Sequence, residues 1–256
     1  MFKIALNAGH GLYTAGKRCL KALDPNETRE WKLNARICEK IEAKLKAYTG
    51  YELIRLDDTT GKTDIALKDR TNKANNWGAD FYLAIHHNAV DPKAYTLVNG
   101  IKCLNGGGIV SIVYTKASAK SIEWQKALYD SLIKHTGLKG NRSQPCPTQN
   151  LHECRESNMP CVLLECGFMD SKTDVPIILT DEFAAKVADA CVEVIVKKAI
   201  EEADNQNDYA KLWQDYVGEK SENAANKDLY SDIPTELPED YKPNYVEDIE
   251  VEEEIK

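Results

Sequence analysis

Histidine side chains follow two apolar segments of the sequence, at points where strands are expected to end. His10 lies between two glycines, shortly after the apolar segment 2–6, and the pair His86 and His87 follows the apolar segment 80–85. Flanking glycines let other groups approach the backbone closely, so packing alone explains His10 poorly. Imidazole is the commonest metal ligand among side chains. The pattern therefore points to a metal site.

Two glutamates stand at similar places. Glu165 directly follows the apolar segment 161–164, where burial is costly unless the carboxylate is paired. Glu30 opens the predicted helix 30–45, where it could equally be a first-turn carboxylate favoured by the helix dipole. The sequence therefore indicates a functional role more strongly for Glu165 than for Glu30.

These residue types match a catalytic zinc site. Such a site uses three protein ligands, for example two histidines and a glutamate, and keeps one position open for water. A second carboxylate off the metal can move protons during hydrolysis. Successive side chains of a strand point to opposite faces, so only one of His86 and His87 can face the site. Spacing alone leaves that choice open.

Strand-like and helix-like segments alternate through residues 1–200. This predicts an α/β fold, a mostly parallel twisted sheet with helices on both faces. In such sheets the carboxyl ends of the strands share one edge, where ligands bind. The expected strands are 2–6, 51–56, 80–85, 108–114 and 161–164, and the expected helices are 30–45, 64–77, 117–135 and 182–198.

The composition changes near residue 200. Residues 201–256 hold 18 Asp/Glu and 5 Lys/Arg, a net charge of −13, so the total of −8 leaves +5 for residues 1–200. We predict a catalytic domain at 1–200 and an acidic tail at 201–256. An apolar stripe predicts a helix at about 208–225, which needs a partner surface for stability, by fold-back or self-association. The remainder of the tail is predicted to be disordered.

The cysteines and the amino-terminal residues indicate in which cellular compartment the protein is made. The eight cysteines form no Cys-x-x-Cys pair, and we expect them to be reduced, mostly buried residues. The first residues resemble no secretory signal, which predicts synthesis in the cytoplasm without a signal peptide. No apolar segment approaches the about 20 residues of a membrane span. No phosphate loop or nucleic-acid motif is present, so neither membrane insertion nor nucleic-acid binding is expected.

Four motifs in order resemble the zinc-dependent N-acetylmuramoyl-L-alanine amidases of bacterial autolysins and phage endolysins. The resemblance covers about residues 2–198. The motifs are Ala8-Gly9-His10-Gly11, Glu30-Trp31-Lys32-Leu33-Asn34, Ala84-Ile85-His86-His87-Asn88-Ala89 and Met159-Pro160-Cys161-Val162-Leu163-Leu164-Glu165-Cys166-Gly167-Phe168-Met169.

The resemblance implies roles for individual residues. One zinc ion per chain would be bound by three ligands, with His86 and not His87 as the second histidine. Glu165 would be the catalytic acid/base, acting on the amide bond between N-acetylmuramic acid and L-alanine of peptidoglycan. Asn7 stands where Asp is common in the family, which puts a hydrogen bond behind the metal site in doubt. The implied zinc ligands are His10, Glu30 and His86, and the implied supporting or substrate-binding residues are Asn88 and Arg155.

The stretch at residues 14–18 is similar to phage endolysins, which favours an endolysin that acts on the cell wall after release. A host sporulation or autolytic amidase is the first alternative. A zinc peptidase that cuts a peptide bond of the stem peptide is the second, because its metal chemistry is identical. A non-catalytic wall-binding module is the third, although it would not need all three ligands together with Glu165.

Overall fold

The computed structural model describes residues 1–90, 95–138 and 145–204. By its internal contacts the chain divides into Met1–Lys198 and Ala199–Lys256. The description below concerns the first unit; of the second, only the end of one helix is described. The expected helix at about 208–225, its association with a partner surface and the disordered remainder lie outside the described residues. These points, and the boundary at residue 200, stay predictions.

The centre of the fold is a mixed six-stranded sheet. Its strand order is β2-β1-β3-β8-β6-β7, and every neighbouring pair is parallel except β6 with β8. The predicted mostly parallel sheet is confirmed, with one direction reversed. The strands are β1 (Phe2–Ala8), β2 (Tyr51–Arg55), β3 (Phe81–Asn88), β6 (Ile109–Tyr114), β7 (Thr148–Gln149) and β8 (Cys161–Phe168).

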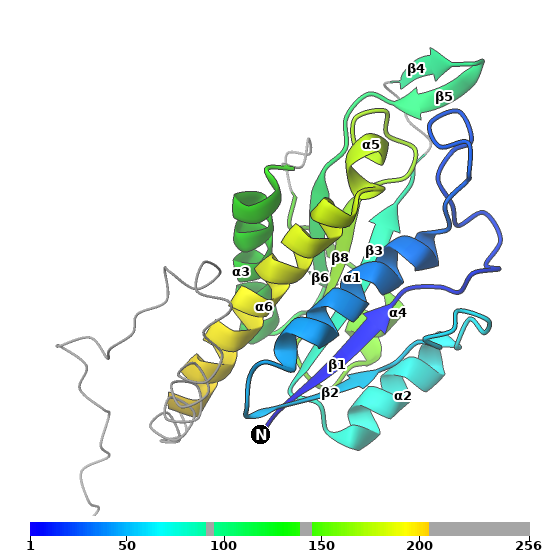
Figure 1. Ribbon diagram of the computed structural model, residues 1–256. Helices are drawn as coiled ribbons and strands as arrows, with labels where there is room; N and C mark the ends of the chain where they lie inside the picture. Colours follow the sequence, from blue (N-terminus) through cyan, green and yellow to red (C-terminus); the bar gives the residue numbers. More distant parts are fainter. Residues whose placement is uncertain (91–94, 139–144, 205–256) are drawn as a thin grey trace, which may run out of the picture. The chain divides into compact units, whose positions relative to one another are not determined.

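Helices cover both faces of this sheet, as expected (Figure 1). One face packs against α1, α3 and α6, and the other against α2 and α4. The short helix α5 follows β8. The helices are α1 (Glu30–Leu45), α2 (Leu67–Trp77), α3 (Ala119–Thr136), α4 (His152–Glu156), α5 (Val175–Ile178) and α6 (Asp181–Asp204). None of the described helices combines the length and apolar character that crossing a membrane requires.

Several elements differ from the sequence-based expectation. Strands β3 and β8 continue past their apolar segments, so the two histidines and Glu165 lie within strands. Helix α2 begins at Leu67 and not at residue 64, because the preceding residues form a loop whose Ile65 carbonyl accepts a hydrogen bond from Arg70. The hairpin of β4 (Tyr95–Val98) and β5 (Ile101–Leu104), together with β7, α4 and α5, was not expected from the sequence.

The cysteines behave as expected. All eight lie in the described part of the chain and are free, and seven of them are buried. Burial raises the pKa of Cys19 to about 12, because the thiolate would lose its hydration there. The thiols therefore pack as small apolar groups.

Aromatic stacking fastens α3 to the sheet. The indole of Trp124 lies 3.8 Å from the ring of Phe81, nearly parallel to it, and 6.2 Å from the ring of Phe2. Both Trp124 and Phe81 are fully buried. The stack joins the helix to two neighbouring strands.

We predict that Trp124→Ala lowers the free energy of unfolding by about 3–5 kcal/mol, because truncating a buried aromatic ring leaves a cavity. Urea denaturation of the purified protein measures the change. Ile122→Ala on the same helix is the control, because Ile122 is 48% exposed and its loss should cost little. Equal losses in the two variants would contradict the role of the stack.

Candidate metal centre

The structure brings three of the predicted residues together. His10, Glu30 and His86 each offer one ligand atom, and these atoms all lie within 4.8 Å of one another. His10 follows β1, Glu30 is the first residue of α1, and His86 lies in β3. Oε1 of Glu30 lies 3.3 Å from Nε2 of His10 and 3.2 Å from Nδ1 of His86. Two imidazoles and one carboxylate form a donor set that suits zinc.

The pleat of β3 separates the two adjacent histidines. His86 is the register partner of Glu165 on β8, so both side chains lie on the sheet face covered by α2 and α4. His87 points to the opposite face, where its Nδ1 lies 2.7 Å from Oδ1 of Asn34 on α1. Burial lowers the pKa of His87 to about 3, so this imidazole is neutral. The structure thus groups His86, and not His87, with His10 and Glu30.

A buried arginine shapes the loop that carries His10. His10 has a φ of +66°, a left-handed conformation that costs a non-glycine residue roughly 1–2 kcal/mol. The guanidinium of Arg70, only 1% exposed, donates hydrogen bonds to the backbone oxygens of Ala8 at 2.9 Å and His10 at 3.2 Å. It also donates to Oδ1 of Asn7 at 2.6 Å. These contacts hold the imidazole of His10 beside Glu30.

Glycine at position 9 makes room for His86. A Cβ atom at Gly9 would lie 2.1 Å from Cε1 of His86, far inside van der Waals contact. The Gly9 carbonyl also accepts a hydrogen bond from Nδ2 of Asn34 at 3.1 Å. The loop after β1 can therefore pass close to the His86 ring only because residue 9 has no side chain.

The charges around His86 favour a cation. Its Nδ1 faces Glu30, and its Nε2 lies 3.4 Å from Oε2 of Glu153. Burial opposes protonation, but the hydrogen bonds to Glu153 and Glu30 outweigh it and raise the pKa of His86 to about 10. Burial also opposes ionisation of Glu30, yet contacts with His10 and His86 lower the pKa of that carboxyl. Two buried carboxylates beside one imidazole hold negative charge that a metal ion would balance.

The second carboxylate oxygen of Glu30, Oε2, also indicates a metal site. Within the described part of the chain, Oε2 of Glu30 is buried and accepts no hydrogen bond. The ammonium of Lys17, a side chain 42% exposed, lies 3.6 Å away. A buried carboxylate oxygen without a hydrogen bond is unusual in proteins, and a bound metal would satisfy it. The residues present therefore fit a divalent ion.

Glu153 was not singled out by the sequence analysis. It lies on α4, is only 4% exposed, and its Oε1 accepts hydrogen bonds from Nδ2 of Asn7 at 2.6 Å and from the hydroxyl of Tyr82 at 2.7 Å. Burial would raise its pKa, but contacts with His86 and Tyr82 hold the pKa at about 2. No local pattern distinguishes Glu153 from Glu156 three residues later; only its burial in the fold does.

The remaining predicted residues lie near the site in different ways. Glu165 stands beside His86 on the neighbouring strand and is partly exposed. Asn88 ends β3, and its backbone oxygen accepts a hydrogen bond from Met169 at 2.7 Å. Arg155 lies on α4, where its guanidinium contacts Glu156 at 2.6 Å and Asn150 at 2.8 Å. None of Glu165, Asn88 and Arg155 is among the residues that line the pocket beside His10 and His86.

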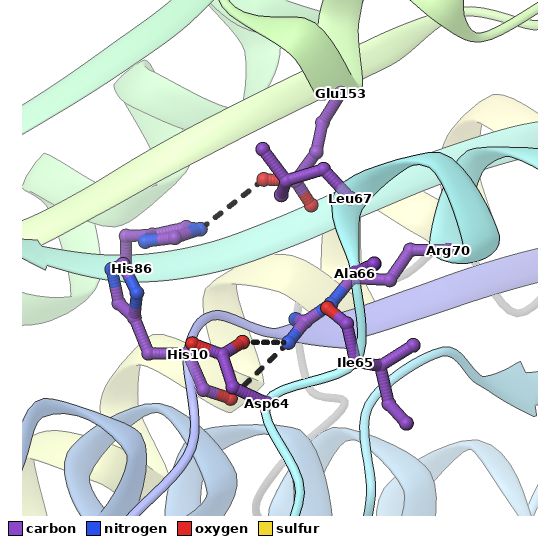
Figure 2. A pocket seen from close by; sticks show the side chains of 8 residues that line it. All are labelled: His10, Asp64, Ile65, Ala66, Leu67, Arg70, His86 and Glu153. Carbon is purple, nitrogen blue, oxygen red and sulfur yellow. Dashed lines mark hydrogen bonds and ion pairs between the residues drawn. The ribbon is translucent and has the colours of Figure 1, made fainter. Parts of the chain in front are cut away.

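A pocket of about 350 Å³ opens beside His10 and His86. Figure 2 shows His86 in contact with Glu153, and Arg70 in contact with Asp64 and His10. The pocket reaches His10 and His86 from the side of α2 and α4. It is lined by His10, Asp64, Ile65, Ala66, Leu67, Arg70, His86 and Glu153.

Comparison with known proteins identifies the family. A family model described as N-acetylmuramoyl-L-alanine amidase matches residues 4–198. The chain belongs to the N-acetylmuramoyl-L-alanine amidase family. The amidases of this family are generally zinc-dependent, and this chain carries a His–Glu–His group that could hold the metal.

Two relatives of this chain are a sporulation amidase and a phage endolysin. A sporulation-specific N-acetylmuramoyl-L-alanine amidase of Bacillus subtilis is 30% identical over 189 residues, and the endolysin of Bacillus phage SPP1 is 28% identical over 197 residues. The matches cover 73% and 75% of this chain, but the chain spans only 64% of the length of each relative.

A solved structure shares the fold of this chain. The crystal structure of an N-acetylmuramoyl-L-alanine amidase from Clostridium difficile 630 superposes with a TM-score of 0.65 at 25% identity. The match covers 77% of this chain and 96% of that one. The fold described here therefore accounts for nearly all of that solved chain.

We predict that Gly9→Ala weakens zinc binding by at least about tenfold, because the new methyl group must push His86 away from Glu30. Competition with a chromogenic chelator measures the affinity. Gly78→Ala is the control: its φ of +68° makes alanine strained, but no atom lies within 4 Å of the new methyl group. That variant should lose some stability and keep its zinc affinity. Wild-type affinity in Gly9→Ala would refute the steric argument.

Proposed function

We propose that this protein is a zinc hydrolase that cleaves the amide bond between N-acetylmuramic acid and L-alanine in peptidoglycan. The observation that carries the proposal is the convergence of His10, Glu30 and His86 within 4.8 Å, in a chain of the amidase family. The bacterial cell wall is then the place of action. A sporulation-specific amidase and a phage endolysin are both among its relatives, and the proposed chemistry would suit either setting.

In this proposal one zinc ion per chain is held by His10, Glu30 and His86. When bound, zinc supplies a Lewis acid that polarises a carbonyl group and lowers the pKa of water to about 7. The protein's part is to hold the three ligands in place. Arg70 holds the loop of His10 through hydrogen bonds to its backbone. Gly9, which has no side chain, leaves space for the ring of His86.

Glu165 is proposed to move the protons. It takes a proton from the attacking water and passes it to the nitrogen of L-alanine as the amide bond breaks, which leaves a carboxylate on the muramic acid side. Its position beside His86 and its partial exposure suit this role. Glu153 suits it poorly, because it is buried and both its oxygens contact protein donors.

The substrate has two proposed supports near this site. Asn88 stands at the end of β3, two residues beyond His86, where an amide could contact the peptide of the substrate. Arg155 is proposed to act from α4, on which Glu153 also lies. Both roles rest on the family resemblance, and that of Asn88 rests also on its place at the carboxyl end of β3.

We predict that His86→Ala abolishes zinc uptake, whereas His87→Ala keeps most of it and chiefly lowers stability, because His87 contacts Asn34 on the other face. Zinc content after dialysis is measured by atomic emission. A chelator should abolish lysis by the wild-type protein, and added zinc should restore it. Equal loss of zinc in the two variants would show that the assignment within the pair is wrong.

We predict that Glu165→Gln keeps the fold and its zinc but lowers turnover by roughly 10²–10⁴, the usual contribution of a positioned acid/base. The assay is digestion of purified sacculi followed by mass analysis of the fragments. The wild-type protein should release peptides that begin with L-alanine, together with glycan free of peptide. New amino termini within the peptide would instead indicate a zinc peptidase. Near-full activity of zinc-loaded Glu165→Gln would remove Glu165 from the mechanism.

A further inference from the structure

We infer that Glu153 is a positioning residue for the metal ligand His86. Its carboxylate oxygen Oε2 lies 3.4 Å from Nε2 of the imidazole, as an ion-pair contact, and so turns Nδ1 toward Glu30 and His10. The inference deepens the proposed function and rests on it, because it assumes that His86 binds zinc. It concerns a residue that no sequence motif marked.

The two nitrogens of His86 face two different carboxylates. Nδ1 lies 3.2 Å from Oε1 of Glu30, which is also 3.3 Å from His10. Nε2, on the other side of the ring, lies 3.4 Å from Oε2 of Glu153. Nδ1 is thus the nitrogen that belongs to the metal-binding group, and Nε2 is left to carry a proton toward Glu153. A carboxylate in this position fixes the tautomer and orientation of a ligating histidine.

Glu153 is itself held rigidly by donors on two strands. Its Oε1 accepts hydrogen bonds from Asn7 on β1 at 2.6 Å and from Tyr82 on β3 at 2.7 Å. These two bonds occupy one oxygen and leave Oε2 for His86. A buried carboxylate is stable only when such donors replace water. The carboxylate therefore cannot turn away from the imidazole without losing buried hydrogen bonds.

Arg70 sets the direction of the Asn7 amide. The guanidinium donates to Oδ1 of Asn7 at 2.6 Å, so the amide nitrogen must face the other way, toward Glu153. An aspartate at position 7 would set a second carboxylate against Glu153, without a proton to share. The amide at position 7, where the family commonly has Asp, is therefore matched to the glutamate at position 153.

The test measures zinc affinity in Glu153→Gln, which keeps the size of the side chain and removes its charge. We expect zinc to bind about 10–100-fold more weakly than to the wild-type protein, the usual effect of removing a partner of a ligand. We also expect a smaller zinc-induced rise in the melting temperature. A purely structural role would lower the melting temperatures of the metal-free and zinc-loaded forms alike and leave that rise unchanged.

Ser157→Ala is the matched control. The Ser157 hydroxyl donates to the backbone oxygen of Glu153 at 2.6 Å, so the variant disturbs α4 without touching the carboxylate. Its zinc affinity should stay within about threefold of wild type, well short of the 10–100-fold effect of a lost ligand partner. If Glu153→Gln does not fold, Glu153→Asp keeps the charge but draws the carboxylate back from His86, and it should weaken zinc binding as well.

The outcomes distinguish a failure of the proposed zinc hydrolase from a failure of the role of Glu153. A wild-type protein that takes up no zinc would overturn the proposed function. A wild-type protein that binds zinc, with folded Glu153→Gln or Glu153→Asp binding it equally well, would overturn only the role of Glu153. Equal weakening in Ser157→Ala would also overturn that role, because it would trace the effect to α4 as a whole.

Discussion

The buried guanidinium of Arg70 is the interaction on which the site depends. It donates hydrogen bonds to the backbone oxygens of Ala8, His10 and Ile65 and to the side chains of Asn7 and Asp64. A buried charge is tolerated only with such partners. Because these acceptors belong to the end of β1 and to the loop before α2, one side chain ties the two segments together. His10 can then keep a backbone conformation that an isolated loop would avoid.

The central strands place the remaining groups by register and by pleat. Gly9 allows the loop after β1 to lie against the ring of His86, so the two histidines can share Glu30. The next residue, His87, faces the opposite layer and joins Asn34, which in turn holds the Gly9 carbonyl. Two adjacent histidines thus serve two layers. His86 faces the group that could hold a metal, and His87 supports the backbone of the loop that carries His10 through Asn34.

The site concentrates buried negative charge. Glu30 and Glu153 are both almost fully buried, and the imidazole of His86 lies between them. In the low dielectric of the interior such carboxylates need a cation or strong donors nearby. Donors from Asn7 and Tyr82 meet this need on the side of Glu153. On the side of Glu30, Oε2 accepts no hydrogen bond and lies 3.6 Å from the Lys17 ammonium, so a metal would help to balance the carboxylate, which agrees with the zinc dependence general in the family.

The sequence alone determined the class of fold, most elements and the residues of the proposed chemistry. The i, i+4 spacing of Leu33, Ile37, Ile41 and Leu45 predicted α1 with its bounds, since periodic burial is a local property. Long-range contacts decided the rest. Spacing treats His86 and His87 alike, and the family resemblance was needed to prefer the one that the pleat turns toward Glu30.

The direction of β6 depends on its partner β8 rather than on its own residues. Glu153 gains its importance from partners 146 and 71 residues away, Asn7 and Tyr82, and only the tertiary structure brings such distant groups together.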